Sequence, residues 1–234
     1  MRISVMQPYL FPYIGYFCLI NSSDTFIFYD DVNYIPRGWI NRNRVLSNGQ
    51  IQTFVMPVKN GSQNKLIKEV RLDSLQYNKN KFIKKIHSAY GRSKRFDYVI
   101  DYIERTFDIE DDLVGTLSQR SVEIALNLLG IQKNIIKSSE NFKETSGVKG
   151  ASRIIEIAHL IGSKNYINPI GGACLYDKKI FKDAGIDLNF LEPQIVAYPQ
   201  PSCIRFIPNL SIIDLLMNID LCDIKKMINL YRLV

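Results

Sequence analysis

The sequence has few residues of the kinds that build metal or disulfide sites. It contains two histidines and four cysteines, and the cysteines are Cys18, Cys174, Cys203 and Cys222. No two of them have C-x-x-C spacing, so we expect no metal site and a reducing compartment. Cys18, Cys203 and Cys222 have apolar neighbours in sequence and are predicted to be small core residues. Cys174 has no histidine nearby to activate it, so it is not expected to be a nucleophile.

No apolar run in the sequence is suited to crossing a membrane, although the first one is long. The stretch VMQPYLFPYIGYFCLI, Val5–Ile20, is interrupted by Gln7, Pro8, Pro12 and Gly15. An interior proline costs a helix about 3 kcal/mol, and a spanning helix needs about 20 apolar residues. A secretory signal needs an unbroken apolar core behind basic residues. We therefore expect a cytoplasmic protein without a leader or a transmembrane segment.

The positive charge of the chain is not accompanied by a zinc-finger, RNP or other nucleic-acid motif. There are 30 Lys+Arg against 23 Asp+Glu, which gives a formal net charge of +7. Such an excess suits nucleic acid, an anionic membrane surface or a phosphorylated small substrate, and charge alone does not choose among them. The lysines between 79 and 94 lie within a segment that has helical periodicity. This favours their placement on a solvated helix face.

The spacing of apolar residues predicts a single α/β domain over 1–234. No internal repeat or low-complexity linker divides the chain, and 46% of its residues are hydrophobic, enough for a substantial core. Short apolar strands alternate with helices that stop at glycine, which predicts a mostly parallel, Rossmann-like sheet flanked by helices. The expected strands are 3–6, 25–29, 134–137, 165–167 and 188–191, and the helices between them are 12–20, 149–161 and 176–184.

Two additions to this sheet are predicted. Asn48-Gly49 is a strong signal for a two-residue turn, so an inserted β-hairpin is expected around it. Apolar residues then recur at helical spacing through about 75–130, which predicts a block of three or four helices. The C-terminal segment, about 211–232, is predicted to form two amphipathic helices, with Ser211 as N-cap and Asp214 completing a capping box.

The loops after the predicted strands are where a ligand site is expected. In open parallel sheets ligands bind beyond the carboxyl ends of the strands, because loops converge there and helix N-termini direct free N–H groups into the crevice. The loops selected in this way are 7–11, 30–44, 138–150, 168–175 and 192–205.

The first of these loops contributes an amide and an aromatic ring. Gln7 and Tyr9 lie on a segment held by two prolines, which makes a stiff platform between two apolar stretches. A strand-end amide needs a hydrogen-bond partner, whereas the tyrosine is also compatible with simple core packing. We predict that both side chains contact substrate.

The second loop begins with a pair of acids, Asp30-Asp31, and these are the predicted catalytic residues. A carboxylate pair at a strand end is compatible with a general base, a ligand of an amine or a metal, or a cap of the following turn. In extended backbone the two side chains would point to opposite faces, so only one would face the crevice.

The only tryptophan stands in a run of arginines and amides, Pro36–Arg44. Arginine forks match phosphate and carboxylate groups, and tryptophan offers a flat surface to a base or sugar. We predict that Trp39, Asn41 and Arg42 bind the ligand, and the alternative is a solvated hairpin strand.

Two later loops resemble anion cradles at helix starts. Asn168, Gly171 and Gly172 lie in a segment predicted to lead into a helix, and Lys149 precedes an earlier one. Backbone N–H groups at such positions bind anions, so two of them on one sheet edge would suit a diphosphate. Ordinary capping is the alternative. Tyr176, just beyond the Gly-Gly pair, completes the predicted substrate-binding set.

Several segments together resemble the WbqC-like family along nearly the whole chain. They are MQPYLFPYIGYF, DTFIFYDDVNYIPRGWINRNRV, NYINPIGGACLYD and NLSIIDLLMN. The resemblance implies a bacterial protein encoded among genes for O-antigen lipopolysaccharide and other surface polysaccharides, with a role as a glycine transferase acting on an amino sugar. The opening also looks somewhat like HxGH nucleotidylyltransferases, but that motif's histidines are absent, with Tyr13 and Tyr16 nearby instead.

These observations lead to one functional hypothesis and two rivals. The hypothesis is a transferase that adds a small acyl or aminoacyl group, glycyl in the resemblance, to the amine of a nucleotide-linked amino sugar. In this scheme Lys149 and Gly171-Gly172 hold phosphates, and Asp30 or Asp31 accepts the proton of the attacking amine. The sequence does not identify a cofactor, and a charged tRNA is the one nucleic acid the scheme allows, as donor. The rivals are a non-catalytic sugar-nucleotide-binding or scaffold protein and a nucleotidylyltransferase.

Overall fold

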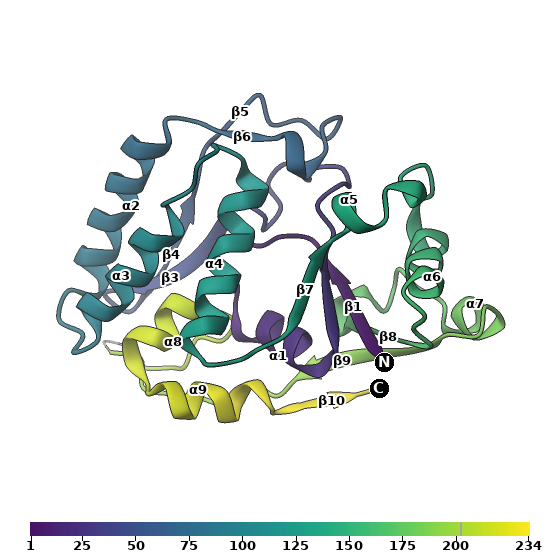
Figure 1. The fold of residues 1–234 in the computed structure, drawn as a ribbon. Coiled ribbons are helices and arrows are strands. Elements are labelled where there is room, and N and C mark those ends of the chain that lie inside the picture. The colour runs from purple at the N-terminus through teal and green to yellow at the C-terminus, as the bar shows by residue number, and fades with distance from the viewer. Residues whose placement is uncertain (202) are drawn as a thin grey trace.

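The computed structural model describes residues 1–201 and 203–234, and Figure 1 shows helices on both faces of a central sheet. In this described part the main sheet has six strands in the order β10-β9-β8-β1-β2-β7, and only the β10–β9 pair is antiparallel. Its strands are β1 (Arg2–Met6), β2 (Thr25–Phe28), β7 (Asn134–Lys137), β8 (Asn165–Pro169), β9 (Asp187–Pro193) and β10 (Tyr231–Leu233). The predicted mostly parallel α/β sheet is confirmed.

The two faces of the sheet are buried in separate cores. Successive strand residues point to opposite faces, so Phe26 and Phe28 enter the larger core while Ile27 enters the smaller one. Residues of α1, α8 and α9 pack in the larger core, and residues of α6 and α7 pack in the smaller one. The bounds of these helices are α1 (Ile14–Ser22), α6 (Gly150–Leu160), α7 (Lys178–Asp183), α8 (Ile212–Asn218) and α9 (Leu221–Ile228).

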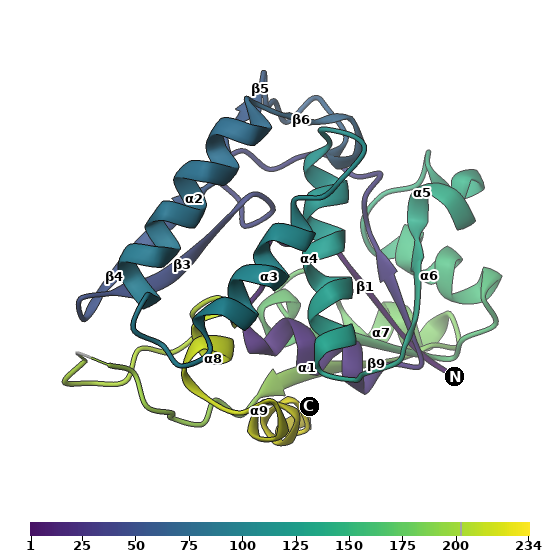
Figure 2. The ribbon, with the colours of Figure 1, turned by 60° about the vertical axis from the view of Figure 1, so that its left-hand side comes forward.

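The predicted hairpin and helical block lie together at one side of the sheet, as Figure 2 shows. Both turn residues of the hairpin, Asn48 and Gly49, have positive φ, as a tight two-residue hairpin turn requires. Phe11 packs against Phe54 of the hairpin and Phe82 of the block, which joins both to the opening loop. The elements are β3 (Arg42–Ser47), β4 (Gln50–Val55), α2 (Leu75–Tyr90), α3 (Phe96–Thr106) and α4 (Val114–Leu128).

Several short elements have no counterpart in the sequence prediction. They include β5 (Val58–Lys59), β6 (Arg71–Leu72), the 3₁₀ turns at Ile67–Glu69 and Lys143–Thr145, α5 (Ser138–Asn141) and β10. Each spans two to four residues, so none is long enough to show a hydrophobic period. α5 matters most for the site, because it begins directly after β7.

Two predicted helix starts are wrong. α1 begins at Ile14 with Tyr13 as N-cap, not at Pro12, because the Pro12 carbonyl accepts a hydrogen bond from the backbone N–H of Ile212 instead. α7 begins at Lys178 rather than at Tyr176. Its N-cap is Asp177, whose carboxylate accepts the Lys179 N–H at 2.8 Å, the usual role of an aspartate at that position.

The C-terminal helices are confirmed, but two details differ. Ser211 caps α8 by accepting from the Ile213 N–H, whereas the Asp214 carboxylate turns away from the expected capping box to bonds with tyrosines. Of the three cysteines predicted in the core only Cys18 is buried. Cys222 is exposed because the buried stripe of α9 is formed by other positions, Ile224, Met227 and Ile228.

Among the residues that the structure describes, no helix combines the length and apolar character needed to cross a bilayer.

Candidate functional site

The order of the strands places a switch point between β1 and β8. The chain leaves β1 through α1 towards β2 and leaves β8 through α7 towards β9, so it turns to opposite sides there. β1 and β8 pair only at their first residues, as far as Ile3–Tyr166. β1 stays paired with β2 up to Met6, and β8 with β9 up to Pro169. The two strands therefore part before their carboxyl ends, where ligands bind in open α/β sheets.

The residues that follow these two strands are Gln7 and the segment beginning at Asn168. The Gln7 side chain is half-buried and makes no hydrogen bond to the described residues, while its carbonyl accepts from the Tyr16 hydroxyl at 2.8 Å. Asn168 is buried and its amide oxygen accepts from the Tyr166 hydroxyl at 2.9 Å. Gln7 is thus the side chain at this edge with free hydrogen-bonding capacity.

The Asn168 side chain lies directly against Gly172. A Cβ on Gly172 would fall 2.0 Å from the amide nitrogen of Asn168, whereas a Cβ on Gly171 would meet nothing within 4 Å. The Gly-Gly pair lies in a 3₁₀ turn, Ile170–Gly172, and α7 begins only at Lys178. The Gly-Gly pair therefore does not stand at a helix end, which an anion cradle of the expected kind requires. Gly172 packs closely against Asn168, and substrate binding by the pair stays a prediction.

The other two predicted residues of this region, Lys149 and Tyr176, have different surroundings. Lys149 is the N-cap of α6 and its side chain is exposed. Tyr176 is half-buried, and its ring packs edge-on against Tyr166 with centroids 6.2 Å apart. Burial raises the pKa of the Tyr176 phenol, so the group stays neutral. Whether either residue binds substrate stays a prediction.

The two predicted catalytic acids form an acid cluster with the start of α5. β2 ends at Phe28, so the strand alternation expected for Asp30 and Asp31 does not apply, and both carboxylates face the Ser138 hydroxyl. Asp30 also accepts from Ser139, from its N–H at 3.0 Å and from its Oγ at 2.7 Å. The expectation that the acids point to opposite faces is wrong, because the chain has left the strand before reaching them.

Arg153 of α6 completes the acid cluster. Its Nη2 lies 2.6 Å from Asp31 Oδ2, and the two side chains are 2% and 4% exposed. The guanidinium also lies 4.9 Å from the ring centroid of Tyr29, and its Nε donates to Thr145 Oγ1 at 3.0 Å. Arg153 pairs with Asp31, whereas Asp30 is bonded to Ser138 and Ser139, so Asp31 is the acid whose formal charge the guanidinium balances.

A second group of side chains, the arginine cluster, consists of Tyr9, Trp39, Arg42 and Arg44. The Arg44 guanidinium lies 5.4 Å from the ring centroid of Trp39, and the Tyr9 and Trp39 centroids are 6.1 Å apart. Trp39 is 47% exposed, and both arginines are half-buried. Arg44 did not stand out in sequence from the other arginines of its run. Its i, i+2 relation to Arg42 within a strand is the signal that places the two side chains on one face.

Asn41, predicted with this group, has its polar atoms occupied inside the protein. Its amide oxygen accepts from the Tyr34 hydroxyl at 2.9 Å, and its amide nitrogen donates to the Met56 carbonyl at 2.7 Å. It is 4% exposed. The side chain thus fixes the start of the hairpin, and we leave it out of the proposed site.

A third polar group, around Asp214, was not recognised as a cluster from the sequence. The buried carboxylate accepts from the Tyr90 hydroxyl at 2.5 Å and the Tyr198 hydroxyl at 2.6 Å. The Gln200 amide lies 3.4 Å away. Burial raises the pKa of Asp214, while these donors act in the opposite direction. The carboxylate therefore joins α2, α8 and the segment 194–201.

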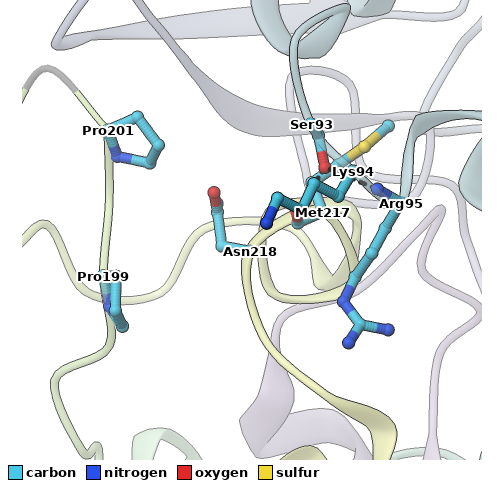
Figure 3. Close-up of a pocket in the computed structure, with 7 residues that line it drawn as sticks. All are labelled: Ser93, Lys94, Arg95, Pro199, Pro201, Met217 and Asn218. Carbon is cyan, nitrogen blue, oxygen red and sulfur yellow. Dashed lines mark hydrogen bonds between the residues drawn. The ribbon is translucent and has the colours of Figure 1, made fainter.

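A hollow of about 550 Å³ opens beside this third group. Figure 3 shows Lys94 and Asn218 extending towards it, with Pro199 and Pro201 on the other side. None of the predicted site residues lines it. Within residues 1–201 and 203–234, no three His, Cys, Asp or Glu side chains lie close enough to hold a metal ion.

Comparison with known proteins gives a family and one relative. Residues 7–225 match the WbqC-like protein family. The chain is 24% identical over 220 residues to "Uncharacterized protein Rv1507c" of Mycobacterium tuberculosis, which covers 93% of this chain and 94% of that protein. No solved structure matches. The match extends over the acid cluster and the arginine cluster, and the chain belongs to the WbqC-like protein family.

Proposed function

We propose that the protein transfers a small acyl or aminoacyl group, glycyl in the family resemblance, to the amine of an amino sugar used for a surface polysaccharide. The observation that carries this proposal is the acid cluster. Arg153 pairs with Asp31 alone, so among the described residues the formal negative charge of Asp30 has no ion-pair partner, at the ends of β2 and β7, one strand away from the switch point. A site with one spare negative charge suits an ammonium group, the resting form of an amino sugar at neutral pH.

The chemistry requires that the ammonium lose a proton, because only the free amine has a lone pair. Asp30 is 4% exposed, so the proton is proposed to reach it through Ser139. The half-buried Ser139 hydroxyl donates to Asp30 Oδ2 at 2.7 Å. It can take the substrate proton as it gives its own to the carboxylate. Asp31 holds Arg153 and does not take part in this transfer.

The freed amine then attacks the carbonyl carbon of an activated acyl donor. A carbon–nitrogen bond forms and the bond to the donor's leaving group breaks. The leaving group departs with the electron pair and takes up the second proton that the nitrogen loses as it becomes an amide. Gln7, with its free amide, is assigned to a hydroxyl of the sugar, and Tyr176 to the same ligand from the β8 side. Asn168, packed on Gly172, supports the turn that carries Tyr176.

A second candidate is a protein that binds the sugar nucleotide without turnover. One observation favours it. Asp30 and Asp31 are 4% and 8% exposed and already accept hydrogen bonds from serines and Arg153. Satisfied buried networks of this kind often serve to fix a structure.

The test is to incubate the pure protein with nucleotide-linked amino sugars and either glycyl-tRNA or a glycyl thioester, and to follow products by mass. The proposal expects a product heavier than the acceptor by one glycyl residue, and it expects Ser139→Ala to slow its formation. Ser146→Ala, an exposed serine beyond α5, is the matched control. Binding of the sugar nucleotide without any product from either donor would favour the second candidate.

A further inference from the structure

The arginine cluster holds two positive charges that the protein does not neutralise. Among the described residues neither Arg42 nor Arg44 forms an ion pair with an acid. Among all the described residues, three buried side-chain polar atoms lack a hydrogen-bond partner. Two of them are Arg42 Nε and Arg44 Nε. A half-buried cation without an ion-pair partner carries a desolvation cost that an anionic ligand would offset.

The residues that contact or lie near these arginines in the described chain include no acid within ion-pair distance. Trp39 and Tyr9 lie beside Arg44, whose Nη2 donates to the Asn209 carbonyl at 3.1 Å. Burial raises the pKa of Tyr9 far above its ordinary value, so its phenol supplies no negative charge. Burial likewise raises the pKa of Tyr34, and the charge of nearby Arg42 opposes this rise. An anion from outside the chain is therefore the missing partner.

The spacing of the two side chains fits two linked phosphate groups. Arg42 and Arg44 are i, i+2 residues of β3, so they leave the same face of the strand about 7 Å apart. Guanidinium groups bind phosphate oxygens through paired N–H donors. The half-exposed ring of Trp39, already against Arg44, offers a surface for a base.

We infer that Arg42 and Arg44 bind the diphosphate of a nucleoside diphosphate, with the base on Trp39, and that this is how the substrate's nucleotide is held. The inference rests on the proposed function for the identity of the sugar, but not for the anion itself. It moves the phosphate contacts away from Lys149 and Gly171-Gly172, since the Gly-Gly pair is not at a helix start.

The opening loop links this site to the switch point. Tyr9 belongs to the arginine cluster, and Gln7, two residues earlier, follows β1. The loop is fixed against the tryptophan-containing segment by a bond from the Leu10 N–H to the Ile40 carbonyl at 3.0 Å. A ligand with its diphosphate on Arg42 and Arg44 can therefore extend its sugar along a rigid path towards Gln7.

The experiment is isothermal titration of the full chain with inorganic pyrophosphate and with uridine diphosphate. We expect both to bind, and Arg42→Gln and Arg44→Gln each to weaken both affinities at least tenfold. Trp39→Leu should weaken uridine diphosphate at least fivefold and leave pyrophosphate within twofold. Arg37→Gln, an exposed arginine of the same segment, and Lys149→Gln should stay within twofold of the natural chain.

The outcomes separate this inference from the transferase proposal. Absence of binding to both probes, or full affinity in Arg42→Gln and Arg44→Gln, would overturn the inference, as would a tenfold loss in Lys149→Gln alone. Because Arg44→Gln also removes the bond to Asn209, Arg44→Lys provides a folded alternative that keeps the charge and should bind with intermediate affinity. Binding as expected without glycyl transfer would leave the diphosphate site standing and remove the transferase proposal.

Discussion

Arg153 and Arg42 are the same residue type in two different states. Arg153 is 2% exposed and is held by a carboxylate, a hydroxyl and an aromatic face. Arg42 is half-buried, makes no ion pair with the described residues and has an Nε without an acceptor. The first arginine is part of what keeps the sheet edge folded. The second has no ion-pair partner among the described residues, which is the state expected of the anion-binding residue proposed above.

The largest effect should come from removing the partnered arginine. Arg153→Met leaves Asp31 buried and uncompensated, and breaking one side of a buried pair costs about 3–5 kcal/mol. Urea denaturation measures this loss in the free energy of unfolding. The double variant Arg153→Met with Asp31→Asn should recover a large part of it. A loss below about 1 kcal/mol in the single variant would show that the pair is not what holds α6 to the sheet edge.

The two acids of the acid cluster, Asp30 and Asp31, should differ in what their substitution changes: turnover for Asp30 and stability for Asp31. Asp30→Asn keeps the shape but cannot take a proton, so turnover in an established transfer assay should fall about 100-fold or more, with ligand affinity within a few-fold. Asp31→Asn should act mainly on stability, because Asp31 holds Arg153. Full turnover in both variants would remove the acid–base role of this cluster.

The unpartnered arginine should show the reverse pattern to Arg153. Arg42→Ala is expected to weaken binding of a sugar nucleotide by about 1.5–3 kcal/mol, the usual value of a hydrogen bond to a charged group. The melting temperature should hardly change, because the side chain has no ion pair in the described chain to lose. Calorimetric titration and thermal denaturation of the same sample give both values. Parallel losses in the two would instead make Arg42 structural, like Arg153.

Alanine substitutions at the two adjacent glycines, Gly171 and Gly172, should differ in their effect on stability. Gly172→Ala would bring a methyl group to 2.0 Å from the Asn168 amide nitrogen, whereas Gly171→Ala meets nothing within 4 Å. Overpacking of this kind costs about 1–3 kcal/mol, and the open position should stay within about 0.5 kcal/mol. Denaturant midpoints of the two variants test this directly. Equal midpoints would contradict close packing as the reason for glycine at 172.

The smallest expected effect is the contribution of Asp214 to the pH dependence of the free energy of unfolding. Burial raises the pKa of Asp214 above its ordinary value of 3.8, so the folded chain binds this proton at a higher pH than the unfolded chain. Its protonation therefore favours the folded state as pH falls through the raised pKa, and the gain is complete below about 3.8. Compared with Asp214→Asn, the natural chain should gain stability on acidification, by at most about 1.4 kcal/mol per pH unit. If the natural chain and Asp214→Asn showed the same dependence of stability on pH, this contribution of Asp214 would be ruled out.

Much of the fold could be predicted because the long elements show their periods. The long helices α2, α3 and α4 fill the predicted helical block. The errors fall where a tertiary contact outweighs a local signal. Pro12 is drawn into a bond with Ile212, and Asp214 into bonds with Tyr90 and Tyr198. Local sequence carries no trace of partners this far away along the chain.

The candidate site was predicted in its residue types but not in their roles. The rule that ligands bind beyond strand ends selected Gln7, Asp30 and Asn168, and the fold places the ends of β1 and β8 at a switch point. Asn41 has the right chemistry for a ligand, yet its amide is used inside the hairpin. Residue type alone does not show whether a polar group is already satisfied, because satisfaction depends on what the folded chain brings next to it.

The sequence by itself determined the alternation of strands and helices, since it follows from periods of two and 3.6 residues. Only the tertiary structure decided which charges are neutralised. Asp31 and Arg153 are 122 residues apart in sequence and meet at 2.6 Å, whereas no acid of the described chain reaches Arg42 or Arg44. The reason is physical: Coulomb attraction and desolvation depend on distance in space, which only the folded chain sets.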